Sequence, residues 1–300
     1  MSTKLTITAK DYYDSTPSTG NCAGDIWVNL PTYGLLGTKR YPGIVITPPC
    51  DLAQGKVDAI TYLPIINLAN YFSTTAFAPI VMRELRVQLT QLDRNDLPET
   101  SGRFSLPRLE ALIGFEVEIG LRAKAPRANA KEIAAAAKAI ACIGILKKIC
   151  DGESSECTPE LIIEAMGSKF AKALHENLIK NSHAIDLHFL PKDDQPKEWS
   201  AIESHSIVLF RYPITAPVEL FDEAQELGVR DWNAVVGRVS KKVPAAAAFA
   251  DVRPMKRAVL KSGFFADLLT RYAAMHIRVG SPDFTSMTVA SYIADLGFPR

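Results

Sequence analysis

The chain has 300 residues, of which 47% are hydrophobic and 22% charged, and its formal net charge is +1. This composition is typical of a folded globular protein, and it excludes a wholly disordered chain and a fibrous repeat. Because the net charge is close to zero, the molecule as a whole does not attract nucleic acid or membrane electrostatically. Any nucleic-acid binding therefore has to depend on a local patch of basic residues.

The cysteine pattern and the absence of common sequence motifs argue against several further classes of protein. The five cysteines are odd in number and form no Cys-x-x-Cys pair, which argues against a zinc ribbon and a disulfide framework. No Walker-type loop, dinucleotide turn or His-Glu-x-x-His occurs, so we expect no cofactor. The N-terminal segment has no apolar core of signal-peptide length, and no stretch approaches the ~20 apolar residues of a membrane span. We therefore expect a cytoplasmic location and no membrane contact.

The first part of the chain, to about Thr90, predicts strands and turns. It is rich in glycine, proline and β-branched residues, and we expect strands over residues 27–30, 43–47 and 59–63. Residues 85–89 alternate apolar and polar side chains, which predicts a further strand with one face in water.

The middle part changes to a helical pattern. Residues 128–150 are rich in alanine and carry an apolar stripe at helical spacing. Thr158 and Pro159 are typical of a helix start, because a hydroxyl caps the first turn and proline fits its first position. We expect this second helix to reach about Leu178 and to form an antiparallel hairpin with the first.

The last part returns to strands and ends in helices. Residues 185–190 and 206–210 indicate a hairpin of strands with a long polar loop. Arg253, Lys256 and Arg257 share one face if Pro254 opens a helix, and residues 264–279 are typical of an amphipathic helix.

Three segments, in order and spacing, resemble the opening of PemK/MazF-type toxins. Residues 24–34 read Gly-Asp-Ile-Trp-Val-Asn-Leu-Pro-Thr-Tyr-Gly, residues 38–47 read Thr-Lys-Arg-Tyr-Pro-Gly-Ile-Val-Ile-Thr, and residues 62–66 read Tyr-Leu-Pro-Ile-Ile. The resemblance implies a small, strongly bent β-barrel and cleavage of single-stranded RNA by an arginine and a hydroxyl. Arg40 matches the arginine, whereas Ile66 stands where the hydroxyl is expected. Residues 47–52 also resemble a Thr-Pro-x-Cys-Asp-Leu signature of uncharacterised bacterial proteins.

From pattern and resemblance together we predict an α+β protein with a small PemK-like β-barrel, an inserted α-helical hairpin and C-terminal helices. Strands from both ends of the chain would share the barrel, and the alternative is a separate C-terminal domain. The corresponding divisions are barrel strands in residues 1–103, a helical insertion in 104–182, and returning strands with C-terminal helices in 183–300.

Cys50 and Asp51 are candidate catalytic residues together with Arg40. They follow a predicted buried strand, and a thiolate nucleophile needs a nearby group that lowers its pKa. The alternative is that Cys50 is a small buried side chain and Asp51 caps a turn. A zinc site of Cys50, His188 and His205 is chemically reasonable, but no spacing requires it, so no metal is predicted.

A binding role has its own candidate residues, namely Arg40, Tyr41, Arg253, Lys256 and Arg257. The fork of an arginine suits phosphate or carboxylate, and a basic face contacts several phosphates. Tyr41 would stack on an unpaired base. The alternatives are a solvated basic surface and a tyrosine in the barrel core.

Two functions follow from these residues. The first is a binding or regulatory component of a bacterial defence or toxin–antitoxin type system, on a toxin-like barrel that has lost catalysis; its partner would be a protein, with RNA or DNA as the other candidate ligand. The alternative is an endoribonuclease or other hydrolase acting through Arg40, Cys50 and Asp51. The isoleucine at the hydroxyl position favours the first.

Overall fold

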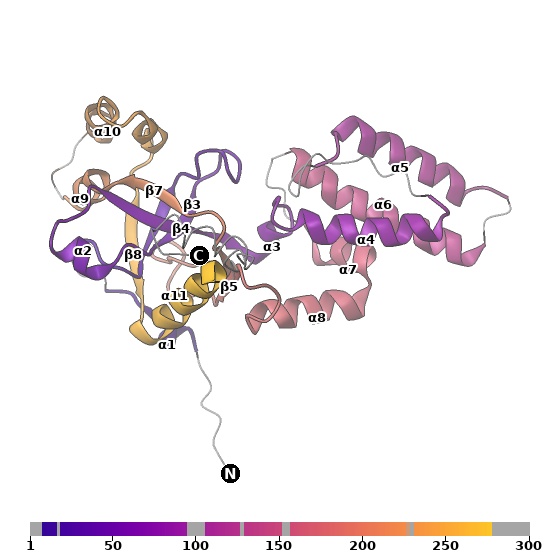
Figure 1. Cartoon of the computed structure of the whole chain (residues 1–300), viewed down its shortest axis with the longest axis horizontal. Coiled ribbons are helices and arrows are strands. Elements are labelled where there is room, and N and C mark those ends of the chain that lie inside the picture. The colour runs from indigo at the N-terminus through magenta and orange to yellow at the C-terminus, as the bar shows by residue number, and fades with distance from the viewer. Residues whose placement is uncertain are drawn as a thin grey trace, which may run out of the picture.

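The computed structural model describes residues 8–16, 19–94, 106–126, 129–151, 157–226, 228 and 231–277. A β-sheet with its covering helices forms one end of the molecule, and a group of helices forms the other (Figure 1). The predicted α+β class is confirmed. The strands are β1 (Tyr13–Asp14), β2 (Asp25–Leu30), β3 (Tyr41–Val45), β4 (Ala59–Asn67), β5 (Leu187–Leu190), β6 (Ser206–Leu209), β7 (Ile214–Pro217) and β8 (Met255–Leu260).

The helices fall into three groups along the chain. Three short helices accompany the early strands: α1 (Ala9–Tyr12) precedes β1, α2 (Pro49–Ala53) lies between β3 and β4, and α3 (Leu68–Tyr71) follows β4. The helical end of the molecule consists of α4 (Ala78–Gln91), α5 (Leu109–Ala123), α6 (Ala130–Asp151), α7 (Pro159–Met166) and α8 (Ser168–Ile179). The last group is α9 (Val218–Gln225), α10 (Trp232–Ser240), the 3-10 helix η1 (Pro244–Phe249) and α11 (Ser262–Ile277).

Strands from both ends of the chain share one antiparallel sheet, which curls into part of a barrel. Its order is β1-β8-β2-β3-β4-β6-β5, and β7 pairs with β4 outside this path. β4 is the long strand that joins the two parts of the sheet, because residues 59–62 pair with β7 and residues 65–67 pair with β6. Pro64, which has no backbone N–H to donate, lies where β4 changes partner.

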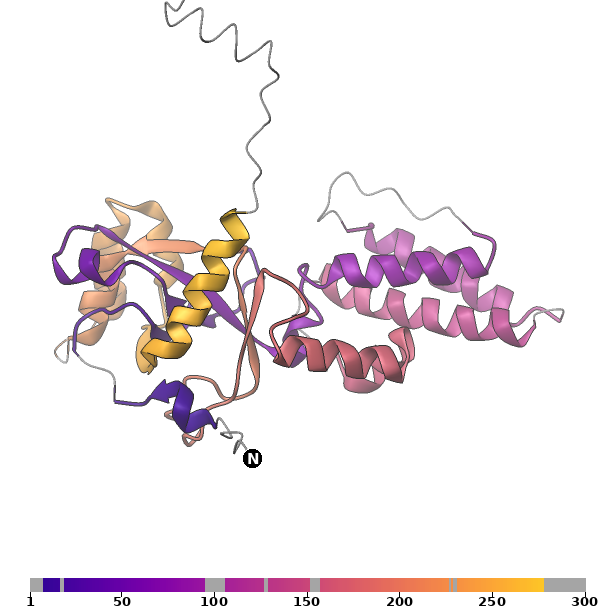
Figure 2. The same ribbon diagram turned by 60° about the horizontal axis from the view of Figure 1, so that its bottom comes forward.

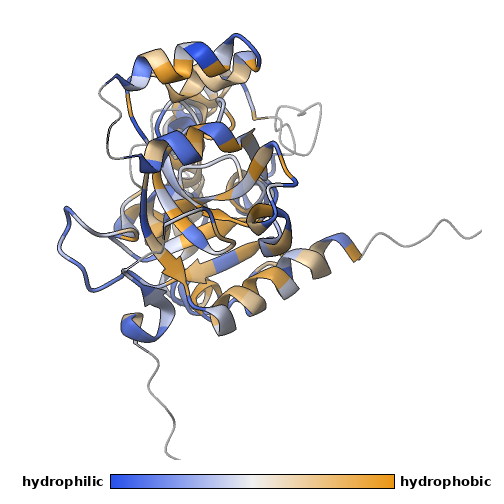
Figure 3. Ribbon diagram, turned by 90° about the vertical axis from the view of Figure 1, so that its left-hand side faces the viewer, coloured by the Kyte–Doolittle hydropathy of each residue, from blue (hydrophilic) through white to orange (hydrophobic). Residues whose placement is uncertain are grey.

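Each face of the sheet is covered by a different set of helices. Alternate residues of β2 point to opposite faces, so Trp27 and Ile26 belong to separate cores. The Trp27 core contains Phe221 of α9 and Phe249 of η1. The Ile26 core is closed by α11, which lies across the sheet (Figure 2). Hydrophobic residues predominate in the strands between these two layers (Figure 3).

The helical end is built around α6, which packs against α4, α5 and α7. Neighbours on several sides explain why alanines such as Ala136 and Ala139 are fully buried, since small side chains let helices approach closely. Thr158 caps α7 as predicted, accepting a hydrogen bond from the Leu161 N–H at 3.3 Å. Gly167, with φ of +81°, separates α7 from α8, so the single helix predicted here is two helices.

The strand predicted over residues 85–89 is wrong, because these residues lie in α4. Leu85 and Leu89 are buried together with Val81 and Met82 at helical spacing, whereas Val87 points to solvent. Within residues 85–89 alone, the side chains of this helix alternate between apolar and polar in the same way as those of a strand.

The helix predicted from Pro254 is also wrong. Residues 255–260 form β8, which pairs with β1 and β2. The predicted helix over residues 264–279 is confirmed up to Ile277 as α11, and residues 278–279 lie outside the described part of the chain. None of the described helices combines the length and apolar character needed to cross a membrane.

Candidate nucleic-acid interface

Two β-bulges on either side of β2 shape the surface where the candidate site lies. Ile26 pairs with Ala258 and Trp27 with Lys256, so Arg257 is an extra residue in β8. On the other edge the register with β3 shifts between Trp27 and Leu30, where Asn29 has a left-handed φ of +66°. A bulge bends a strand and redirects a side chain, and here it places Asn29 and Arg257.

A pocket of about 300 Å³ opens beside Asn29 at the end of the sheet nearest α3. Its lining combines apolar residues with amides, hydroxyls and charged groups, which is the usual composition of a ligand pocket. The apolar lining residues are Val28, Tyr41, Pro42, Ile65, Ala201 and Ile202, and the polar ones are Asn29, Lys39, Arg40, Asn67, Asn70, Ser200, Glu203, Ser204 and Ser206.

Arg40 is held in place in the pocket lining by two backbone carbonyls. Its guanidinium donates hydrogen bonds to the Ala250 oxygen at 2.5 Å and to the Asn29 oxygen at 3.4 Å. A guanidinium has five N–H donors. The two carbonyls therefore orient the group while donors remain for an anionic ligand.

Asn70 also lines the pocket. Its Oδ1 is buried and has no hydrogen-bond partner among the described residues. A buried polar atom without a partner is unfavourable, commonly by about 1–3 kcal/mol.

Trp199 is 66% exposed, although tryptophan is usually well buried. It directly precedes Ser200, which lines the pocket, and the Arg257 guanidinium lies 5.4 Å from the centre of its ring. Arg257 is two residues from Met255, which pairs with Val28 of the pocket lining. Trp199 and Arg257 therefore form an aromatic–arginine pair that is connected to the pocket lining through their chain neighbours.

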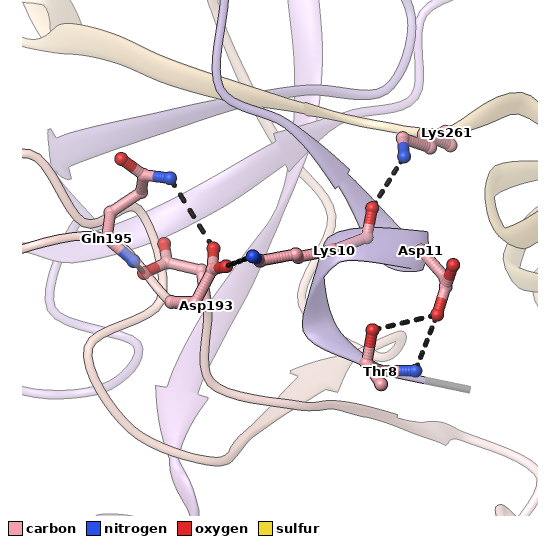
Figure 4. A network of polar contacts seen from close by, with 7 residues as sticks. Thr8, Lys10, Asp11, Asp193, Gln195 and Lys261 are labelled. Carbon is pink, nitrogen blue, oxygen red and sulfur yellow. Dashed lines mark hydrogen bonds and ion pairs between the residues drawn. The ribbon is translucent and has the colours of Figure 1, made fainter. Parts of the chain in front are cut away.

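The loop that carries Trp199 is ordered by Asp193. The Asp193 carboxylate accepts hydrogen bonds from the Ser200 hydroxyl at 2.7 Å and from the Ala201 and Ile202 N–H groups at 2.7 and 2.9 Å. Figure 4 shows the neighbouring part of this loop against α1, where Lys10 pairs with Asp194 at 3.7 Å. The loop is therefore fixed at its base while the indole faces solvent.

Of the sequence-predicted binding residues, Arg40 and Tyr41 line this pocket, and Arg257 lies against Trp199. Tyr41 lines the pocket and is almost fully buried, and its hydroxyl donates to the Leu36 oxygen at 3.3 Å. The structure therefore places its ring in the core and not on an open stacking surface.

Arg253 and Lys256 are held by the protein itself, which corrects their prediction as one exposed helical face. Arg253 donates to the carbonyls of Ala224, in the last turn of α9, and of Glu226, just after it, at 2.7 Å each. Lys256 is buried, with its Nζ 3.1 Å from a carboxylate oxygen of the fully buried Asp25. Both are strand or loop residues with structural partners.

Cys50 and Asp51 lie away from Arg40. They belong to α2, after the carboxyl end of β3, whereas Arg40 precedes the other end of this strand. Five strand residues span about 13 Å, and Figure 1 shows α2 at the far edge of the sheet from α3. The Cys50 side chain is exposed, so its reading as a buried side chain is wrong, and its Sγ contacts the Asp51 carboxylate at 3.6 Å.

The zinc alternative is not supported by the described residues, which contain no group of three or more metal-ligating side chains. His188 is buried and stacks on Phe210 at 6.3 Å between ring centres. Burial lowers its pKa to about 4. His188 is therefore a neutral core residue near α11.

A second, smaller pocket of about 160 Å³ lies where the sheet meets the helices. It is bordered by His183, whose pKa is lowered by burial, and by the ion pair of Asp186 and Arg211. Because Asp186 and Arg211 already satisfy each other, this pocket offers less free charge to a ligand than the pocket at Arg40.

No family model, curated protein or solved structure matches this chain. The site therefore has to be interpreted from its own geometry.

Proposed function

We propose that this chain is a binding component that holds single-stranded nucleic acid across the Arg40 pocket and the Trp199–Arg257 pair. The exposed indole of Trp199, stacked with Arg257 beside a polar pocket, carries the proposal. Unpaired bases stack on aromatic side chains irrespective of sequence, and arginine contacts both the base plane and phosphate.

Each part of the surface has a role in this proposal. Trp199 stacks on one base, and the pocket receives an adjacent unstacked base among its amide and hydroxyl side chains. Arg40 and Arg257 contact the phosphates on either side. These amides, hydroxyls and guanidinium groups are suited to holding a ligand, and the candidate nucleophile Cys50 lies at the other end of β3.

The resemblance to PemK/MazF-type toxins agrees with this ligand class, and the curled sheet is compatible with a partial barrel of that kind. Membership of that family remains a prediction. Three further points also remain predictions: a protein partner, a cytoplasmic location, and a place in a bacterial defence or toxin–antitoxin type system.

The test is fluorescence anisotropy with labelled single-stranded RNA and DNA of about ten nucleotides, a length within the range that small binding folds cover. We expect binding that weakens as salt rises. Trp199→Ala should weaken it about tenfold, because one stacking contact is lost. A comparison of the affinities for RNA and for DNA shows whether the surface prefers ribose or deoxyribose.

Phe170→Ala is the matched control, because Phe170 is also a partly exposed aromatic but lies on α8. It should bind like the wild type. Circular dichroism checks that both variants fold. No binding by the wild-type chain, or equal affinity of Trp199→Ala and the wild type, would overturn the proposal.

A further inference from the structure

Helix α5 has two apolar faces, and the described residues cover only one of them. Leu112 and Ile119 are buried against the helical core. On the opposite side Ile113, Val117 and Leu121 are 44%, 57% and 67% exposed, at successive intervals of four residues. A continuous apolar stripe on a helix surface usually marks a contact with another element or another chain.

The exposed face of α5 is symmetric about Val117. Ile113 and Leu121 lie four residues before and after it, and Gly114 and Gly120 lie three residues before and after it. Glu110 and Lys124 lie seven residues before and after it, and both are exposed. With 3.6 residues per turn, all of these positions fall on the same side of the helix as Val117.

This symmetry makes the face complementary to itself in one arrangement. When a second copy of α5 crosses the first antiparallel at Val117, Ile113 meets Leu121 of the other copy, and Glu110 meets Lys124. A two-fold interface requires such a self-complementary patch. The opposed directions of the helices also place their dipoles favourably.

The two glycines allow the helices to approach closely. A Cβ atom at Gly114 or Gly120 would have no heavy atom within 4 Å, so the surface above both positions is open. Without side chains there, the backbone of a partner helix can lie near Val117.

We propose that α5 is a homodimer interface, in which the α5 helices of two chains pack antiparallel about a two-fold axis at Val117. The partner is a second copy of this chain, because the antiparallel arrangement pairs the opposite charges at the two ends of the stripe, Glu110 with Lys124 of the other copy. The interface lies on the helical end of the molecule, so it is independent of the proposed nucleic-acid surface.

Sedimentation velocity over about 1–100 μM chain tests this, a range suited to a micromolar association. We expect the wild type to shift from monomer to dimer as concentration rises. Val117→Asp should remain monomeric, because it puts a charge at the centre of the apolar contact. Ile179→Asp on α8 is the control, because Ile179 is an exposed β-branched residue like Val117, and it should dimerise like the wild type.

Charge reversal identifies the geometry. Glu110→Lys and Lys124→Glu should each weaken dimerisation at least several-fold, because each opposes like charges. The double variant with both changes should recover the wild-type association. A wild type that is monomeric throughout the range, or a double variant weaker than both single variants, would overturn the proposal.

Discussion

Replacing Lys256 by methionine is expected to lower the free energy of unfolding by about 3–5 kcal/mol at neutral pH, because it leaves a buried carboxylate without its counter-ion. Asp25 is fully buried, and the Lys256 side chain is only 6% exposed. The pair lies 3.1 Å apart between β2 and β8 and also places the Lys256 Nζ 5.8 Å from the centre of the Trp27 ring. The removal of either charge therefore disturbs the sheet at its centre.

The loss of stability caused by Lys256→Met should become smaller as pH falls. Burial raises the pKa of the Asp25 carboxyl above its ordinary value of 3.8, although the Cys22 N–H and Lys256 both act to lower it. Without Lys256 this pKa rises further. The protonated Asp25 carboxyl contributes its full stabilisation at pH values below the pKa of Asp25 in the unfolded chain. This stabilisation is lost as pH rises through the pKa of Asp25 in the folded protein. The variant is therefore weakest at neutral pH and closest to the wild type in acid.

Urea unfolding of the variant at several pH values down to about 4 measures this effect. Lys261→Met is the matched control, because Lys261 is an exposed lysine just after β8 that donates to the Lys10 oxygen. It should change stability by less than about 1 kcal/mol. Wild-type stability of Lys256→Met, or a deficit independent of pH, would show that the ion pair does not support the fold.

Gly43→Ala is expected to lower the free energy of unfolding by about 2–3 kcal/mol through overpacking. Gly43 lies in β3 between Trp27 of β2 and Pro64 of β4. A Cβ atom there would come within 2.8 Å of side-chain carbons of both Leu30 and Tyr62. Tyr62 is fixed by its hydroxyl, which donates to the Pro31 oxygen at 2.6 Å, so it cannot move aside easily.

The same substitution at Gly237 is the control for Gly43→Ala. Gly237 lies in α10, is exposed and would place a Cβ atom in open space. Alanine there should stabilise the protein by about 0.5–1 kcal/mol, because it restricts the unfolded chain and favours helix. Thermal and urea unfolding compare the two variants. A neutral or stabilising Gly43→Ala would contradict the close packing of β2, β3 and β4.

The parts of the fold that depend on local sequence could be predicted. The early strands follow from β-branched runs between glycines and prolines, and the start of α7 follows from Thr158 and Pro159. α4 could not be separated from a strand over residues 85–89, because its helical face becomes clear only when Val81 and Met82 are included. β8 could not be predicted from its local sequence, because its neighbours in the sheet come from the other end of the chain.

The candidate site was only partly predictable for a similar reason. Arg40 was identified from a resemblance, whereas the burial of Lys256 depends on Asp25, which is far away in the sequence. The left-handed conformation of Asn29 and the bulge at Arg257 are properties of strand register, which composition does not encode. Trp199 had one usable signal, since it is a single tryptophan in the polar stretch from 192 to 203.

The most direct measurement of the proposed function is photo-crosslinking to a single-stranded oligonucleotide that carries 4-thiouridine or 4-thiothymidine, followed by mass spectrometry of the linked peptides. The proposal predicts crosslinks in residues 192–206, which contain Trp199, and in residues 255–260, which contain Arg257. Trp199→Ala should lose most of the first set. Crosslinks confined to helices α4–α8, or to α2 with Cys50 and Asp51, would contradict it.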